Sequence, residues 1–324
     1  MTAGLAIAAV IGLGFLGLVV GLWVLLGWLG AWRINRPPSY QPDANFAFTP
    51  WELDLEFSTI EFKTADDVRL HGWFLPRPSS RRVVIVMHGY RGHKAQLLGI
   101  SSYLWRAGFN VLLFDFRGRG TSDRASISMG LWEQEDLKAA LEVANKQVPR
   151  ATIGLLGYSV GGVVALLGGS DPRVAAIAVD SVFASQRTML EHVARRESRQ
   201  YLRGWLDGRV FLLAVEWWHR RWGKPPFSAI APEAAMPKLA DKPVLVIHGS
   251  QDALVPRQHA ERLVAISPDK HEAWFVKGAH HCGAYFVDRP AYSVRVAAFF
   301  NRHLESSSNP QEAVGLHRVE TASH

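Results

Sequence analysis

Hydrophobic and polar positions divide the chain into an apolar N-terminal segment and a longer region in which short apolar runs alternate with helical patterns. The short runs are apolar at nearly every position, as expected of strands buried on both faces of a sheet. They lie at residues 70–75, 83–87, 111–114, 152–156, 174–179, 244–247 and 273–276.

Between these runs, the sequence has the spacing of helices that cover a sheet. These helical segments lie at residues 95–107, 131–147, 160–168, 256–265 and 290–304. Strands that alternate with helices are typical of a mostly parallel sheet with helices on both faces. The sequence therefore predicts an α/β fold, and it contains no internal repeat.

The apolar N-terminal segment is long enough to cross a membrane. Residues 2–32 carry no charged side chain, and about 20 apolar residues suffice for a helix to span the hydrocarbon core. A cleaved signal peptide is the alternative, but it would begin with a basic region, and nothing basic precedes Arg33. We therefore expect residues 1–32 to form a single transmembrane anchor. Because Arg33 and Arg36 follow it, the positive-inside rule predicts a cytoplasmic location for the rest of the chain.

Three further segments follow the anchor. Residues 33–50 are rich in proline and predict an extended linker, residues 51–304 form the α/β domain, and residues 305–324 form a flexible polar tail. Within the anchor, Gly17 and Gly21 have the GxxxG spacing of helix pairs. Glycine is common in such helices, so we interpret the pair as lipid-facing, with weak self-association as the alternative.

Composition excludes several classes of protein. The chain is 48% hydrophobic and 20% charged, which excludes a disordered protein. Cys282 is the single cysteine, which excludes an internal disulfide, and no group of Cys and His residues has the spacing of a zinc site. We expect the hydrophobic core to hold the fold, with no metal and no cofactor.

A candidate nucleophile follows the predicted strand at 152–156. Residues 157–161 read GYSVG, which matches G-x-S-x-G, and an apolar helical run begins directly after the motif. In this context the glycines permit a sharp turn that exposes the serine hydroxyl, and the N–H groups of the helix face developing negative charge. We therefore interpret Ser159 as a nucleophile rather than as part of an ordinary glycine-rich turn.

A serine nucleophile also needs a base and an acid that orients the base. In chain order, the serine of such an elbow is followed by the acid and then by the histidine, each on a loop after a later strand. Asp252 lies in the loop HGSQDALVP, and His280 and His281 lie in the loop GAHHCGAY, each directly after a predicted strand. Asp115 and Asp180 also follow strands and are the alternative acids, but the loop of Asp252 favours Asp252.

Taken together, these motifs resemble the α/β-hydrolase superfamily over about residues 52–304. The resemblance rests on HGYRG at 88–92, FDFRGRGTSD at 114–123, the GYSVG elbow and the two loops just described. Within the superfamily, the chain is similar to membrane-anchored bacterial hydrolases and to members akin to serine aminopeptidase and acylaminoacyl peptidase. The resemblance implies Ser159 as nucleophile, Asp252 as acid and His281 as base, because the histidine loop of the family usually reads Gly-Ala-Gly-His. His280 stands where that glycine is usual and is the alternative base.

The oxyanion of such a reaction is held by two backbone N–H groups. One belongs to the residue after the nucleophile, which is Val160, and the other to the loop after the strand at 83–87, where the HGY motif places Tyr90. His88 stands beside these residues, and we interpret it as a residue that structures the loop by hydrogen bonding.

Positive charge concentrates at residues 186–224, where α/β hydrolases insert a helical cap, here about 186–235. This stretch contains nine Lys and Arg residues and four acidic residues, so it holds +5 of the total charge of +7. Its tryptophans are Trp205, Trp217, Trp218 and Trp222. Arginines beside tryptophans suit an anionic membrane surface, and an amphipathic cap that closes the pocket predicts the same pattern. No nucleic-acid-binding motif accompanies the charge, which argues against nucleic acid.

Two classes of function fit these features. The first is a serine hydrolase that cleaves an ester, thioester or amide of a small or lipid-like acyl substrate by acyl transfer. Within this class an esterase is favoured over a peptidase, because an apolar cap suits acyl chains. The second is a membrane-tethered protein that retains the fold and binds a partner, since a fold alone does not prove activity. The complete Ser, Asp, His order favours the enzyme.

Overall fold

The computed structural model describes residues 2–35, 48–201, 203–205 and 207–304. An eight-stranded sheet forms its centre, with the strand order β1-β2-β4-β3-β5-β6-β7-β8. β1 and β2 pair antiparallel, as do β2 and β4, whereas all the later pairs are parallel. The strands are β1 Ser58–Lys63, β2 Arg69–Leu75, β3 Arg82–Met87, β4 Asn110–Phe114, β5 Thr152–Tyr158, β6 Val174–Asp180, β7 Val244–Gly249 and β8 His271–Val276. The predicted α/β fold is confirmed, and only β1 has no counterpart among the predicted strands.

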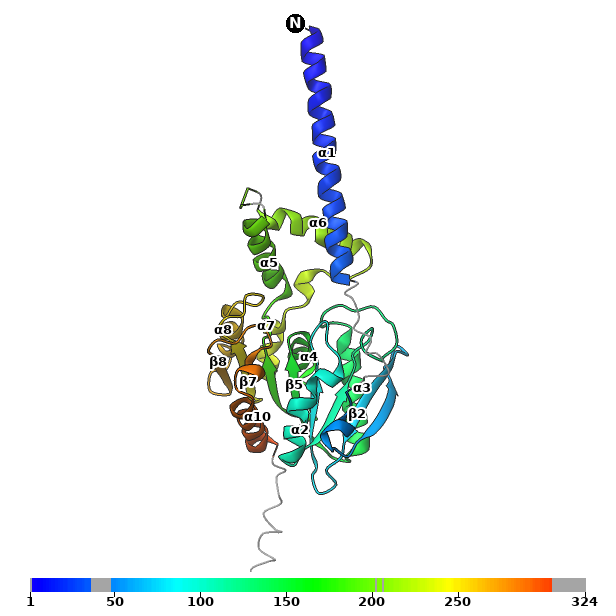
Figure 1. The fold of residues 1–324 in the computed structure, drawn as a ribbon, viewed down its shortest axis with the longest axis vertical. Coiled ribbons are helices and arrows are strands. Elements are labelled where there is room, and N and C mark those ends of the chain that lie inside the picture. The colour runs from blue at the N-terminus through cyan, green and yellow to red at the C-terminus, as the bar shows by residue number, and fades with distance from the viewer. Residues whose placement is uncertain (1, 36–47, 202, 206, 305–324) are drawn as a thin grey trace, which may run out of the picture.

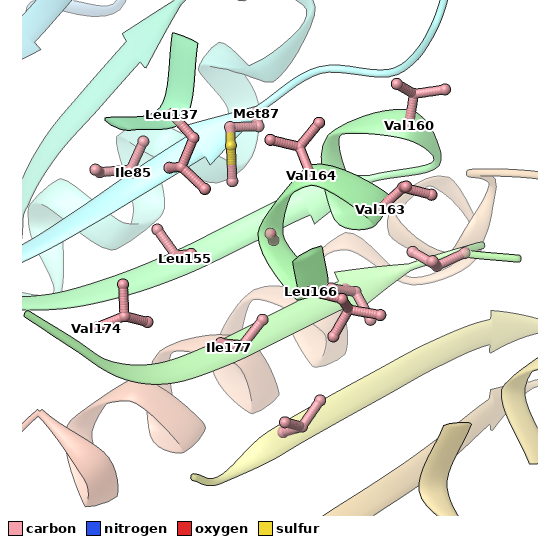
Figure 2. Close-up of a cluster of buried hydrophobic side chains, with 14 of the residues drawn as sticks. Ile85, Met87, Leu137, Leu155, Val160, Val163, Val164, Leu166, Val174 and Ile177 are labelled. Atoms are coloured by element: carbon pink, nitrogen blue, oxygen red, sulfur yellow. The ribbon is translucent and has the colours of Figure 1, made fainter. Parts of the chain in front are cut away.

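Helices cover both faces of this sheet (Figure 1). One buried cluster joins the sheet to α3, α4 and α8, and Figure 2 shows its centre around Leu155, Val164 and Leu166. A second cluster joins the other face to α2 and α10. The helices are α1 Thr2–Asn35, α2 Leu98–Arg106, α3 Glu133–Gln147, α4 Val160–Gly168, α5 Gln186–Tyr201, α6 Gly208–Arg221, α7 Pro232–Ala235, α8 Gln258–Val264, α9 Ala284–Val287 and α10 Arg289–His303. Short 3₁₀ turns lie at Pro50–Leu53, Lys94–Leu97, Phe227–Ala229 and Met236–Leu239.

α5 and α6 lie between β6 and β7, where the sequence predicts a cap. In Figure 1 they stand beyond the sheet on the side from which α1 projects, and α6 crosses the lower part of α1. Leu212 and Val215 of α6 and Ala31 of α1 belong to one small buried cluster. The cap and the end of the N-terminal helix therefore form one packed unit.

The N-terminal helix continues beyond this contact as a long apolar rod (Figure 1). Its stretch Val10–Asn35 has the length and hydropathy of a membrane span, a property that a membrane anchor shares with a signal sequence. At Gly17 and Gly21, the pair with the GxxxG spacing, a Cβ would meet no described atom within 4 Å apart from its chain neighbours and the nearby backbone of its own helix. Most of the predicted linker and the predicted tail at 305–324 lie outside the described residues.

Candidate active site

His281 lies within hydrogen-bonding distance of both residues that are predicted to act with it, Ser159 and Asp252. His281 Nε2 lies 3.0 Å from Ser159 Oγ, and His281 Nδ1 lies 2.8 Å from Asp252 Oδ2. They follow β5, β7 and β8, whose carboxyl ends lie at the same edge of the parallel sheet. This geometry fits the tautomer in which Nδ1–H donates to the carboxylate and Nε2 can accept the serine proton.

Ser159 lies on a sharp turn between β5 and α4. Its φ is 50° and its ψ is −115°, a backbone conformation that L residues rarely adopt. A Cβ on Gly161 would lie 2.5 Å from the carbonyl oxygen of Met87, so only glycine allows the turn to approach β3 this closely. The G-x-S-x-G spacing therefore places the hydroxyl above the sheet, at the start of α4.

Asp252 is held by its own loop. Its Oδ1 accepts hydrogen bonds from the N–H groups of Leu254 and Val255, at 3.0 and 2.9 Å, which leaves Oδ2 for His281. Burial alone would raise the pKa of Asp252, but His281, the N–H of Val255 and His248 together outweigh burial, and the pKa falls below its ordinary value. Asp252 is therefore a carboxylate at neutral pH.

The alternative residues lie elsewhere. His280 is exposed, and its Nδ1 lies 3.2 Å from the carbonyl oxygen of Gln251. Asp115 binds Lys94 and Thr121. Asp180 is fully buried and accepts hydrogen bonds from the hydroxyls of Ser181 and Tyr292, and burial raises its pKa to about 6. The structure therefore brings His281 and Asp252 to Ser159, and none of these alternatives.

The loop after β3 carries the predicted second oxyanion donor. Tyr90 and Val160 line the same cavity as Ser159. Val160 is the first residue of α4, so its N–H has no acceptor within the helix. His88 lies within hydrogen-bonding distance of the carbonyl oxygen of Gly89 and accepts from the N–H of Phe116, at 2.7 and 3.1 Å, which confirms its predicted role in structuring the loop. Burial lowers the pKa of His88 to about 4, so it is neutral.

Arg119, which follows β4, also contacts this loop, and it was not singled out from the sequence. Its Nε donates to the carbonyl oxygen of Tyr90 at 2.7 Å, and its guanidinium lies 5.4 Å from the centre of the Tyr90 ring. Arg119 belongs to the FDFRGRGTSD motif, so the signal for it was present in the sequence. We interpret Arg119 as a residue that positions the loop of Tyr90, the predicted second oxyanion donor.

Ser159 and His281 open into a cavity of about 1440 Å³, larger than the 300–1,000 Å³ that is typical of small-molecule sites. Aliphatic and aromatic side chains dominate its wall, and many of them come from the cap helices α5 and α6. Glu197 is the only acidic residue among the lining residues, whereas Arg33 and Arg91 supply two cations. The cavity therefore suits an apolar substrate better than a cationic one.

The basic residues of the cap differ in their surroundings. Arg187 pairs with Glu191 and Glu216, and Lys224 donates to the carbonyl oxygen of Ile127 and lies over the ring of Trp132. By contrast, five arginines are exposed and have no hydrogen-bond or ion-pair partner in the described part of the chain. They are Arg195, Arg199, Arg203, Arg220 and Arg221. Lys224 therefore joins the cap to Ile127 and Trp132 of the α/β domain, whereas these five arginines are accessible.

Comparison with known sequences gives related proteins of similar length. A family model described as serine aminopeptidase, S33, matches residues 78–203. The uncharacterized protein Rv2307c of Mycobacterium tuberculosis is 32% identical over 233 residues, which cover 71% of this chain and 74% of that protein. The uncharacterized protein YfhR of Escherichia coli is 26% identical over 284 residues, which cover 84% and 87%.

Solved structures show the same architecture. The esterase Pf2001 of Pyrococcus furiosus is 27% identical, with a TM-score of 0.67 over 83% of this chain and 98% of that chain. The protein XC6422 of Xanthomonas campestris, described as a serine hydrolase without a lid, shares the fold at 19% identity and a TM-score of 0.54, over 78% of this chain and 97% of that chain.

Proposed function

This chain belongs to the α/β-hydrolase family, and from that premise we propose that it is a membrane-anchored serine hydrolase that cleaves carboxylic esters or thioesters. The observation that carries the proposal is the continuous hydrogen-bonded chain from Ser159 through His281 to Asp252, at the wall of a large apolar cavity. The likeness to the Pyrococcus furiosus esterase supports the choice of ester chemistry.

In the proposed mechanism, Ser159 Oγ attacks the acyl carbon while His281 Nε2 takes its proton. Asp252 holds Nδ1–H and stabilises the imidazolium that forms. The N–H groups of Tyr90 and Val160 bind the oxyanion. His281 then returns the proton to the leaving alcohol or thiol, and an acyl-enzyme remains on Ser159. Water, activated by His281 in the same way, attacks the acyl-enzyme, and the collapse of the second oxyanion releases the acid and restores the Ser159 hydroxyl.

An aminopeptidase is the second candidate, because the matching family model carries that description. Such an enzyme must bind a substrate ammonium group, which requires acidic side chains near the nucleophile. Glu197 alone among the cavity-lining residues could serve, and the rim also carries Arg33 and Arg91. The charge of the cavity therefore favours the esterase.

Fluorophosphonate labelling, followed by a panel of acyl esters and an aminoacyl anilide, tests the proposal. We expect the full chain to be labelled at Ser159 and to hydrolyse esters faster than the anilide. Absence of labelling would support the alternative of a catalytically silent binding protein, whereas faster cleavage of the anilide would support the aminopeptidase.

The orientation of the anchored chain is a separate prediction. Because Arg33 and Arg36 follow the apolar span and no basic residue precedes it, we expect the domain in the cytoplasm. In a bacterial host, a reporter fused after Leu304 that fluoresces only in the cytoplasm should be active, and an alkaline phosphatase fusion at the same point should be inactive. The reverse pair of signals would place the domain outside.

Contact between the cap and lipid is a further prediction. Leu213 lies on the outer face of α6 and is 53% exposed, whereas Val294 of α10 is 54% exposed at a helix remote from α1. In a Cys282→Ser background, a fluorophore on Leu213→Cys should be shielded from aqueous iodide and quenched by lipid-borne quenchers, because the arginine and tryptophan side chains of α6 suit the bilayer interface. The same fluorophore on Val294→Cys should behave in the opposite way. Equal quenching at the two sites would show that the cap only covers the pocket.

A further inference from the structure

The end of the N-terminal helix forms part of the wall of the active-site cavity. Leu26, Gly30, Arg33 and Ile34 of α1 line the same cavity as Ser159. They face the cavity from three successive turns of α1, a distance of about 12 Å along its axis. A tether alone would need no contact with the site, so this part of α1 has a second role.

The wall is fixed in place by close packing against α6. A Cβ on Gly27 would lie 2.4 Å from Ala214 Cβ, and one on Gly30 would lie 2.8 Å from Val215 Cγ2, so the two helices meet through glycine. Two indole N–H groups cross this contact, from Trp23 to the carbonyl oxygen of Val210 and from Trp218 to that of Val24, each at 3.0 Å. α1 and α6 therefore form one rigid wall.

The same wall reaches the oxyanion loop. The hydroxyl of Tyr90 donates to the carbonyl oxygen of Ile34, at the last turn of α1. Asn35 adds a bond from its Nδ2 to Nδ1 of His219 on α6, at 3.0 Å. The position of the membrane helix is thus coupled through one hydrogen bond to the residue that is proposed to donate to the oxyanion.

The tryptophans indicate where the edge of the membrane lies along α1. The part of α1 before Trp23 measures about 32 Å at 1.5 Å per residue, which matches the ~30 Å hydrocarbon core. All three tryptophans of α1 (Trp23, Trp28 and Trp32) follow that part, and Trp217, Trp218 and Trp222 lie on or next to α6, which crosses α1 at the same level (Figure 1). Tryptophan is enriched at the membrane–water interface. The cavity wall made by α1 and α6 therefore lies where the bilayer ends.

The rim of the cavity carries two accessible cations. Arg33 and Arg91 are exposed and have no hydrogen-bond or ion-pair partner in the described residues. They are the chain neighbours of Ile34 and Tyr90, which are hydrogen-bonded to each other. Two guanidinium groups beside an apolar cavity suit an anionic headgroup whose acyl chain lies inside.

We propose that the substrate is a membrane lipid with a long acyl ester and an anionic headgroup, which reaches Ser159 from the bilayer along the wall formed by α1 and α6. This inference rests on the proposed serine hydrolase. The acyl chain lies against Leu26 and Gly30 of α1, the ester carbonyl lies at Ser159, and the headgroup lies near Arg33 and Arg91. Hydrolysis transfers the acyl group to Ser159 Oγ and then to water, and it releases a fatty acid and the lipid alcohol.

The route from the bilayer is tested with the full chain reconstituted in vesicles. Dipalmitoyl phosphatidylglycerol, which exchanges slowly between vesicles, is placed either in the vesicles that hold the protein or in separate vesicles, and released palmitate is measured. We expect release only when lipid and protein share a bilayer. Equal release from the two preparations, or no release in either, would overturn the proposal.

The contact with α1 is tested by a matched pair of substitutions. Leu26 lines the cavity and is 42% exposed, whereas its neighbour Leu25 is 52% exposed and does not line the cavity. Leu26→Trp should lower the ratio of kcat/KM for a palmitoyl ester to that for a butyryl ester by about tenfold. This is the effect of excluding roughly one to two CH₂ groups from the apolar wall, since each costs about fourfold in affinity. Leu25→Trp should leave this ratio unchanged. An unchanged ratio in Leu26→Trp would overturn the assignment of the wall.

The headgroup is tested with palmitoyl lysophosphatidylglycerol and palmitoylglycerol, which present the same acyl ester with and without an anionic phosphate. We expect faster hydrolysis of the phospholipid, and Arg33→Gln/Arg91→Gln should reduce that preference. Equal rates in the unaltered protein would overturn the anionic headgroup. Hydrolysis of a soluble acetyl ester distinguishes failure of the proposed serine hydrolase from failure of the proposed lipid substrate. If the acetyl ester is not hydrolysed, the serine hydrolase itself is refuted. If the acetyl ester is hydrolysed but the lipid is not, only the lipid substrate is refuted.

Discussion

Ser159→Ala is expected to reduce kcat/KM for a small activated ester to below about a thousandth of its original value, since loss of a triad serine typically costs more than this. In the proposed mechanism this hydroxyl forms the acyl-enzyme, and its Oγ lies 3.0 Å from His281 Nε2. The rate is measured with a chromogenic acetyl ester, and the melting temperature is measured in parallel.

The fold should survive this substitution, because alanine keeps the Cβ and the strained backbone of residue 159 while removing one hydroxyl at the cavity wall. Ser267→Ala is the matched control. The hydroxyl of Ser267 also makes one hydrogen bond among the described residues, to the carbonyl oxygen of Ala240, but Ser267 precedes β8, at the end of the sheet opposite the site. We expect this control to retain full activity. Substantial activity in Ser159→Ala would identify another nucleophile.

The buried strands were predictable because each carries a continuous apolar run. β3, β5 and β7 are covered on both faces, so their sequences need no polar side. β1 was missed for the complementary reason. It is an antiparallel edge strand whose residues are exposed or half-buried throughout, so no apolar run marks it.

The candidate site was predictable to the extent that each residue stands in a motif at the end of a strand. The preference for His281 over His280 came from the loop pattern of the family, and the sequence itself did not separate the two neighbours. In the structure His281 lies 3.0 Å from Ser159 Oγ, whereas His280 lies near the carbonyl oxygen of Gln251. The role of α1 was not predictable from local pattern. In the contact between α1 and α6, Gly27 packs against Ala214, which lies far away in the sequence. Neither segment alone specifies which helix it packs against.

Asp252→Asn is expected to lower kcat by about 10⁴-fold, with little change in KM for a small ester. The carboxylate accepts the Nδ1–H of His281 at 2.8 Å and so holds the tautomer whose Nε2 is a base. An asparagine amide would instead donate to Nδ1, which places the proton on Nε2 and prevents it from accepting the serine proton. The substituted side chain keeps its size, and its oxygen can still accept from Leu254 and Val255, so the loop should remain folded.

Asp180→Asn is the matched comparison, since Asp180 is the alternative acid at the end of the neighbouring strand β6. Its carboxyl binds Ser181 and Tyr292 rather than His281. Burial raises its pKa to about 6, so a neutral amide resembles a form that the folded protein already populates below that pH. We therefore expect kcat to fall far less in Asp180→Asn than in Asp252→Asn when both are measured with the same ester at the same pH. If Asp180→Asn had the larger effect, the acid of the triad would lie on β6, and the hydrogen bond between Asp252 and His281 would not be the one that sets the tautomer during catalysis.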